Sequence, residues 1–213
     1  MKFLRPALFF VIIIIAASWL SKTGVWRNNK TGVSSGKAIK EFLNLSANNK
    51  LKEKAASIKS FLLRKGYNNE VCFFIDMSLP SGQNRFFIYD LQNDSLRSRG
   101  LVAHGNCFEN WMEGRKYSNT VGSGCTSLGK YRVGIHYYGK FGYSYKLHGL
   151  DSSNNNAFER TVVLHSHSCV PETEIADEIC QSNGCPTVSP GFLEYLKKII
   201  NSSKKPVMLW IYE

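Results

Sequence analysis

Short runs of apolar and aromatic residues, each followed by turn-forming residues, recur along the chain from Glu70 onward. Runs of this length are typical of β-strands, because a helix needs a longer stretch with apolar residues every three to four positions. Many short strands joined by turns predict a mainly β protein, built as a sandwich or barrel-like sheet with a few helices. The predicted strands are Val71–Met77, Arg85–Leu91, Leu101–His104, Tyr131–Tyr138, Ser144–Leu150, Thr161–Cys169 and Val207–Tyr212.

Two regions have apolar residues at helical spacing instead. Lys37–Lys65 fits two helices, or one helix broken near Asn48–Asn49, and Gly66 follows as a C-cap. Gly191–Asn201 fits a further helix near the end of the sequence. Asn28–Gly36 is rich in Gly, Ser and Asn and is interpreted as a linker. The long polar stretch between the third and fourth predicted strands is expected to lack regular structure.

The N-terminal segment is predicted to direct export. Lys2 and Arg5 form a short basic lead, and Ala7–Leu20 is an almost unbroken apolar run. This run is shorter than the ~20 apolar residues of a membrane span, and the layout is typical of a secretory signal. We therefore interpret residues 1–22 as a signal peptide, with a retained membrane anchor as the alternative. Either interpretation places the rest of the chain outside the cytoplasm, in the periplasm or cell envelope.

The chain carries a net charge of +11, from 27 basic and 16 acidic residues. Lys and Arg are spread along the sequence and form no block of the kind that binds nucleic acid, so no nucleic-acid partner is predicted. An exported basic protein can instead meet an anionic envelope polymer or a membrane surface. Simple solubility explains the charge equally well.

Six cysteines follow the predicted helical region, and in an exported protein some of them are expected to form disulfides. Cys169 with Cys180 would close a short loop, and Cys107 with Cys125 is a second plausible pair, but the connectivity stays open at this point. The remaining two cysteines are Cys72 and Cys185. No CxxC pair occurs, so neither a thioredoxin-type redox motif nor a zinc ribbon is supported.

Cys185 is the main candidate for a catalytic residue. It follows Gly184, which lets the backbone approach a substrate because glycine has no Cβ, and it precedes Pro186, which fixes the chain after it. A thiol must lose its proton to attack a carbonyl, and backbone amides around Gly184 would hold the oxyanion that forms. A buried or disulfide-bonded cysteine on a turn is the alternative interpretation.

His165 is predicted to be the base for this thiol. It ends an apolar run, so it is expected at the rim of a sheet, and Cys185 follows twenty residues later, after a loop long enough to fold back. His167 has the same parity and would share the strand face of His165. A zinc site is a rival hypothesis, but ligands at alternate positions of one strand lie in a line and chelate a metal poorly. Its ligands would come from His165, His167, Cys169, Cys180 and Cys185.

The stretch Ser182–Pro186 resembles the Ser-x-Gly-Cys signature of murein L,D-transpeptidase catalytic domains, in the branch that continues with Pro. Further blocks resemble this family in the same order over about residues 70–213, and several blocks in register are more specific than one short motif. The blocks are Ile75–Ser81, Leu101–Gly105, Ser118–Asn119, Gly122–Ser123, Ser127–Gly129, Tyr137–Lys140, Leu147–Leu150 and Val162–His165. The resemblance implies an L,D-transpeptidase-like catalytic domain over residues 69–213, preceded by a linker and helical segment over residues 23–68.

The resemblance also implies a reaction on peptidoglycan stem peptides. Cys185 would attack the carbonyl between the L-centre of diaminopimelate and D-Ala, release D-Ala and hold the rest as a thioester, with His165 as base and Gly184 beside the oxyanion. The amine of a second stem would then complete a 3→3 cross-link. No cofactor and no metal is predicted. The residues expected on the substrate side are His148, for which a structural role is equally open, His167, Ser182 and Asn183.

Two alternatives share this resemblance. With water as the acceptor, the same site would be an L,D-carboxypeptidase; an inactive wall-binding domain is the other alternative, against which the intact candidate nucleophile and base argue. The chain also departs from the family: Ser166 replaces the usual Gly after the histidine, and Gln181 stands where relatives often carry Arg. A cation for a substrate carboxylate would then come from Arg132 or Arg160.

Overall fold

The computed structural model describes the backbone of residues 32–213 and the side chains of residues 45–213. Residues 45–213 form one compact unit. The predicted export segment, residues 1–22, lies outside the described residues. Within the described part of the chain, no helix combines the length and the apolar character that a membrane crossing requires.

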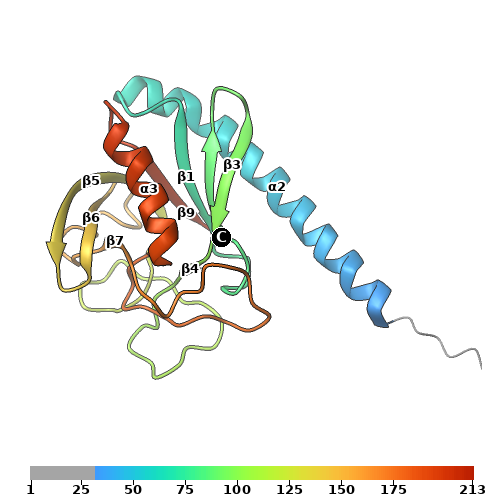
Figure 1. The fold of residues 1–213 in the computed structure, drawn as a ribbon. Helices are drawn as coiled ribbons and strands as arrows, with labels where there is room; N and C mark the ends of the chain where they lie inside the picture. The colour runs from blue at the N-terminus through green and yellow to red at the C-terminus, as the bar shows by residue number, and fades with distance from the viewer. Residues whose placement is uncertain (1–31) are drawn as a thin grey trace, which may run out of the picture. The chain divides into compact units, whose positions relative to one another are not determined.

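Nine strands form a single sheet (Figure 1). Across the sheet they lie in the order β3, β2, β1, β9, β5, β6, β7, β8 and β4. β9 lies inside the sheet, parallel to β1 and antiparallel to β5. The mainly β prediction is therefore confirmed. The bounds are β1 Val71–Asp76, β2 Phe86–Asp90, β3 Ser95–Gly100, β4 Val102–Ala103, β5 Gly129–Gly139, β6 Gly142–Gly149, β7 Val163–Ser166, β8 Thr187–Val188 and β9 Met208–Tyr212.

The sheet is nearly closed because its two edge strands follow each other in the sequence. β3 forms one edge and β4 the other, and only the buried Leu101 separates them. β4 pairs with β8, which in turn pairs with β7. The chain thus passes from one edge of the sheet to the other through one residue, although β3 and β4 do not pair with each other.

The strands alternate their side chains between two hydrophobic cores. On β1, Phe73 and Ile75 belong to the first core, whereas Cys72 and Phe74 belong to the second. This alternation follows from the two-residue period of a strand. The prediction of β1 from its continuous apolar run is explained by the burial of both faces, since all six residues of the strand are buried.

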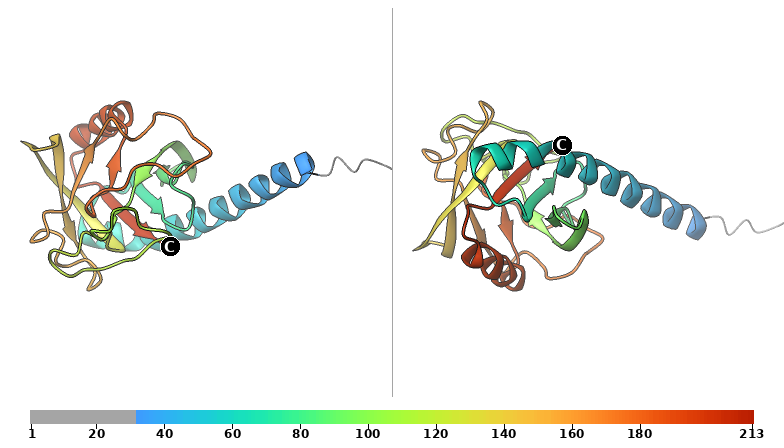
Figure 2. Two further views of the ribbon diagram at one scale, coloured as in Figure 1. Left: turned by 90° about the horizontal axis from the view of Figure 1, so that it is seen from below. Right: turned by 90° about the horizontal axis from the view of Figure 1, so that it is seen from above.

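Helix α3 (Pro190–Ser202) covers the first core, as predicted for this part of the sequence. Its buried face includes Phe192 and Leu196. Ser189 is the N-cap, and its hydroxyl accepts a hydrogen bond from the Phe192 N–H at 3.3 Å, which satisfies one of the free donors at a helix start. Figure 2 shows α3 on the opposite side of the sheet from the C-terminal part of α2.

Helix α2 (Gly32–Lys65) covers the second core with its described part. It begins at Gly32, so the predicted linker is wrong from that residue on, and it continues through Asn48–Asn49 without a break. Packing against the sheet outweighs the low helix propensity of these residues. Gly66 has a φ of +70° and ends the helix, as predicted. The residues of α2 that belong to the second core are Ala47, Leu51, Ala55, Ile58 and Leu62.

Three strands differ from the prediction. β8 is only two residues long and was not predicted, and its pairing with β4 and β7 holds it in the sheet. β3 has no apolar pattern, since most of its side chains are exposed, and it is held by its pairing with β2. β7 is shorter than the predicted Thr161–Cys169. It ends at Ser166, and the N–H of His167 donates to the carbonyl of Val188 at 3.0 Å.

A cationic side chain is fully buried where the sheet closes. Arg85 donates to the carbonyl of Val102 from Nε at 3.0 Å and from Nη2 at 2.8 Å, and to the carbonyl of Leu79 from Nη1 at 3.1 Å. Its Nη2 also lies 2.9 Å from Nδ1 of His104, which must accept because a guanidinium only donates. Burial, with the charges of Arg85 and Arg115, lowers the pKa of His104 to about 4.

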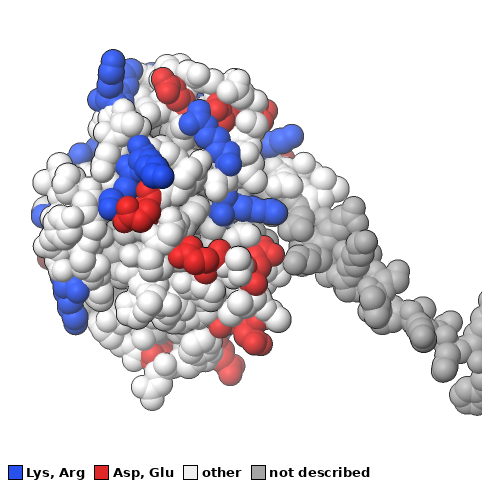
Figure 3. Space-filling view, in the orientation of Figure 1, with Lys and Arg blue, Asp and Glu red and all other residues white. Residues whose placement is uncertain are grey.

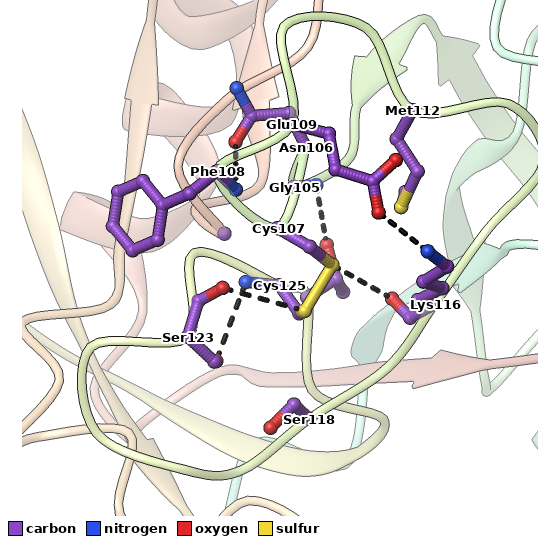
Figure 4. Close-up of a disulfide and its surroundings, with 12 residues drawn as sticks. Gly105, Asn106, Cys107, Phe108, Glu109, Met112, Lys116, Ser118, Ser123 and Cys125 are labelled. Atoms are coloured by element: carbon purple, nitrogen blue, oxygen red, sulfur yellow. Dashed lines mark hydrogen bonds and ion pairs between the residues drawn. A yellow bond between two sulfur atoms is a disulfide. The ribbon is translucent and has the colours of Figure 1, made fainter.

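The long stretch between β4 and β5 forms no strand, as predicted. A disulfide between Cys107 and Cys125 joins its two ends (Figure 4). The N–H of Asn106 donates to the carbonyl of Ser182 at 2.8 Å, so one end of the loop is fixed beside the segment that carries Cys185.

Candidate active site

The segment that carries Cys185 is held by backbone pairing on both sides. Ser182 forms an isolated parallel bridge with Gly105, and its N–H donates to the carbonyl of His104 at 2.8 Å. β8 then begins at Thr187, two residues after Cys185. The candidate nucleophile therefore lies on a short, fixed turn.

Gly184 is required by the shape of this turn. Its φ is +102°, and a Cβ placed on it would lie 2.6 Å from the carbonyl oxygen of Cys125. The hydroxyl of Ser182 closes the turn, since it accepts from the Gly184 N–H at 3.2 Å and donates to the carbonyl of Cys185 at 2.7 Å. A side chain at position 184 would strain the backbone and push the loop of Cys125 away.

The Cys185 thiol is free and partly buried. Its Sγ accepts a hydrogen bond from the Val163 N–H at 3.4 Å and lies 3.9 Å from the carbonyl oxygen of Thr161. Burial raises the pKa of the thiol, against smaller opposite effects of the Val163 N–H and the charge of Arg160. The thiol is therefore protonated at neutral pH and depends on a base for its activation.

All six cysteines lie in the described part of the chain. Both predicted pairs, Cys107–Cys125 and Cys169–Cys180, are disulfides. Cys72 is free but fully buried, and burial raises the pKa of its thiol. Cys185 is thus the one free thiol with access to solvent. The zinc hypothesis is wrong, because the sulfurs of Cys169 and Cys180 are bonded to each other, and the described side chains include no cluster that could hold a metal.

His165 lies on β7, and its ring is held by three contacts. Thr187 is its partner in the parallel pairing with β8, and the Thr187 Oγ1 lies 3.0 Å from Nε2. Nδ1 lies 3.1 Å from the carbonyl of Ser166. A carbonyl only accepts, so Nδ1 carries the proton and Nε2 of the neutral ring has the free lone pair. The ring of Phe141 stacks on the imidazole, with centroids 4.3 Å apart.

The imidazole of His165 is neutral at pH 7. Burial lowers its pKa, the Ser166 carbonyl opposes this, and the charge of His167 lowers it further. Nε2 is therefore a base that bonds to the Thr187 hydroxyl in this structure. Among the described residues no hydrogen bond joins His165 to Cys185, so the thiol must turn toward Nε2 when a substrate is in place.

One pocket of about 200 Å³ contains both candidates. Every predicted site residue lines it except Gly184, which forms the backbone of the turn, and His148. His148 stacks on Phe158 with centroids 5.1 Å apart, a placement that favours the structural role. The lining residues are Ala103, Phe141, His165, His167, Cys169, Cys180, Gln181, Ser182, Asn183, Cys185 and Thr187.

Three polar or aromatic lining residues were not among the predicted ones. Thr187 could have been predicted from the sequence, since it is a polar residue two positions after Cys185 in a short extended run. Gln181 exchanges two hydrogen bonds with the backbone of Met112, at 3.0 and 2.8 Å, and so fixes the loop beside the pocket. Phe141 lies in the turn between β5 and β6, and only tertiary structure brings it to His165.

Comparisons with solved structures find chains described as L,D-transpeptidases and one described as a helical cell shape determining protein. One from Xylanimonas cellulosilytica is 16% identical, with 72% of this chain and 68% of that chain covered and a TM-score of 0.38. One from Mycobacterium smegmatis is 10% identical, with 68% and 59% covered and a TM-score of 0.39. The helical cell shape determining protein Pgp2 from Campylobacter jejuni is 12% identical, with 67% and 47% covered and a TM-score of 0.43. The chain thus spans about half to two thirds of the length of these structures.

A search of curated proteins finds no match. A family model described as the L,D-transpeptidase catalytic domain matches residues 43–212. This range includes the described part of α2 that packs on the sheet, all nine strands, and the pocket of Cys185 and His165. The chain therefore belongs to the L,D-transpeptidase catalytic-domain family.

Proposed function

We propose that the protein is a cysteine L,D-transpeptidase that acts on peptidoglycan stem tetrapeptides. The observation that carries the proposal is the pocket in which Cys185, the one free thiol with access to solvent, lies beside His165 with an unprotonated Nε2. The family supplies the substrate class, and the pocket supplies a nucleophile and a base.

In the first step the Cys185 sulfur attacks the carbonyl carbon between the L-centre of diaminopimelate and D-Ala. The thiol proton passes to Nε2 of His165, which exchanges its contact with the Thr187 hydroxyl for the sulfur. Ser166 holds the proton on Nδ1 and so keeps Nε2 available as the acceptor. The thiol and the imidazole are both neutral at rest. The proton transfer that makes a thiolate and an imidazolium therefore takes place only when the substrate is present.

The tetrahedral oxyanion needs donors at the turn. The Gly184 N–H already donates to the Ser182 hydroxyl, whereas the Cys185 N–H has no acceptor among the described residues, so it is the proposed oxyanion donor. When the oxyanion collapses, the bond to D-Ala breaks and its nitrogen takes the proton from His165. A thioester between Cys185 and the diaminopimelate carbonyl remains.

The acceptor that resolves this thioester is proposed to be an amine. The segment closed by the Cys169–Cys180 disulfide contains four acidic residues and no Lys or Arg, in a chain of net charge +11. Both cysteines line the pocket. Figure 3 shows acidic side chains gathered on the lower part of one face of the molecule. An acidic segment that adjoins the pocket attracts a cationic amine and so favours transfer over hydrolysis.

Function in the cell envelope is part of this proposal. Two disulfides persist in an oxidising compartment, whereas cytosolic thiols are kept reduced. The interpretation of residues 1–22 as an export signal, or alternatively as a membrane anchor, agrees with that location.

The test is incubation of the purified protein with a disaccharide-tetrapeptide, followed by mass spectrometry of the intact protein. A thioester adduct on Cys185 with release of D-Ala is the expected result. Addition of a second stem peptide should then yield a cross-linked dimer, whereas an adduct lost to water alone would identify a carboxypeptidase. The Cys185→Ala variant should form no adduct, and Cys72→Ala, which removes the other free thiol, should form it normally. An unmodified wild-type protein with unchanged substrate would refute the proposal.

A further inference from the structure

Arg160 is a half-buried cation beside the turn that carries the candidate nucleophile. Its Nη2 lies 3.4 Å from the position that a Cβ on Gly184 would occupy. The next residue in the chain, Thr161, has its carbonyl oxygen 3.9 Å from Sγ of Cys185. The guanidinium and the thiol therefore approach the same turn from two sides.

The guanidinium of Arg160 binds four neutral acceptors on the neighbouring loop. Nη1 donates to the carbonyl of Ser118 at 2.7 Å and to the hydroxyl of Ser127 at 3.0 Å. Nη2 donates to the hydroxyl of Ser123 at 3.2 Å and to the carbonyl of Cys125 at 2.5 Å. The terminal nitrogens of Arg carry four of its five N–H groups, so only Nε–H is left. Arg160 is thus not free to hold a substrate carboxylate with both terminal nitrogens.

The positive charge of Arg160 has no acidic partner. None of its four acceptors is charged, and within the described residues no carboxylate forms an ion pair with it. A partly buried charge without a counter-charge is costly. An anion that forms nearby would lower this cost, and the Cys185 thiolate is such an anion.

We propose that Arg160 is the positioning residue of Cys185, which fixes the 118–127 loop against the Gly184 turn and compensates the negative charge that develops on the sulfur. This role rests on the proposed nucleophilic function of Cys185. The same carbonyl of Cys125 that accepts from Arg160 lies against Gly184, so the loop, the turn and the cation form one assembly.

The other titratable groups near the thiol do not supply a compensating positive charge in the protein without substrate. Burial lowers the pKa of His165 and raises the pKa of Tyr131 to about 12, so both are neutral at pH 7. His167 is exposed, and solvent screens its interactions. Burial raises the pKa of Cys185, and Arg160 is the charged group that acts in the opposite direction.

The test is the rate of Cys185 alkylation by iodoacetamide between pH 6 and 10, followed by intact mass. The reagent reads this site alone, because Cys72 is fully buried and the other cysteines are disulfides. Arg160→Gln is expected to shift the alkylation profile upward and slow the reaction roughly tenfold at pH 8, the effect of one pKa unit. Arg99→Gln, which removes an exposed arginine on β3, should leave the profile unchanged.

Arg160→Lys separates the charge from the hydrogen bonds. Lysine keeps the positive charge but cannot reach four acceptors, so this variant should melt at a lower temperature while its alkylation profile stays within about threefold of wild type. A tenfold shift in Arg160→Lys, or an unshifted profile in a folded Arg160→Gln protein, would overturn the proposal. If Arg160→Gln does not fold, the neutral Arg160→Met variant, which keeps the apolar stem of the side chain, takes its place. Alkylation needs no turnover. The effect of Arg160 on the thiol can therefore still be measured if the acyl-adduct experiment fails.

Discussion

Acidification to pH 5 is expected to destabilise the protein through His104. This imidazole is 1% exposed, its Nδ1 accepts from Arg85, and burial with two nearby arginines lowers its pKa to about 4. In the unfolded chain the pKa is about 6.5. The folded state therefore favours the neutral ring. The contribution of His104 to the free energy of unfolding is complete above pH 6.5 and is lost as the pH falls toward 4.

The linkage relation gives the size of this loss. With pKa values of about 4 in the folded and about 6.5 in the unfolded state, the free energy of unfolding falls by about 2 kcal/mol between pH 7 and pH 5, and by about 3 kcal/mol below pH 4. For a domain of this size that moves the urea midpoint by roughly 1 M. Asp90, whose pKa is lowered to about 2 chiefly by the Asn93 N–H, has not begun to titrate in the folded state at pH 5.

The measurement is urea unfolding at pH 7 and pH 5 for wild type and His104→Asn. The amide oxygen of Asn can accept from Arg85 in place of Nδ1, but it does not titrate. The variant is expected to be less stable at pH 7 and to lose about 2 kcal/mol less than wild type on acidification. His165 and His148 also have lowered pKa values, and their contribution cancels in this comparison. An equal loss in both proteins would refute the reasoning.

Three further changes test the site and the fold. Gly184→Ala is expected to slow acyl-adduct formation about 100-fold, because the Cβ would displace the turn. The control is Gly66→Ala, which also has a positive φ but has open space around the added Cβ and does not line the pocket. Equal losses in both variants would mean that the clash is not the cause. Leu62→Ala should lower the free energy of unfolding by about 3 kcal/mol and the exposed Leu63→Ala by less than about 0.5 kcal/mol, as read by urea denaturation; similar values would show that α2 is not part of the cooperative unit. Replacement of both cysteines of the 169–180 disulfide by Ser should cost about 3 kcal/mol, and an unchanged melting temperature would contradict this.

Much of the fold could be predicted because its strands are buried on both faces. β1 and β9 read as continuous apolar runs, since each contributes to both cores. β3 could not be predicted in the same way, because an exposed edge strand is held by main-chain hydrogen bonds that every residue type can form. The unbroken course of α2 past Asn48–Asn49 likewise depends on packing against a sheet that is distant in sequence.

The candidate site divides along similar lines. Cys185 and His165 could be predicted because nucleophile and base are rare residue types that stand in a turn and at a strand end. The contact between Thr187 and His165 depends on the register of two parallel strands, and the stacking of Phe141 depends on how far the β5–β6 hairpin reaches. Neither the register nor the reach is encoded in the local sequence pattern.

The position of β9 between β1 and β5 has a consequence for how the chain acquires its structure. β1, β2 and β3 are made early and β5 to β8 later. Apart from the two-residue pairing of β4 with β8, the early strands join the late ones through Met208–Tyr212. A nascent chain that has not reached Tyr212 has two incomplete half-sheets with exposed inner edges, so the sheet must wait for the whole domain to be synthesised. Long-range pairing of this kind folds slowly, which keeps the chain unfolded for longer.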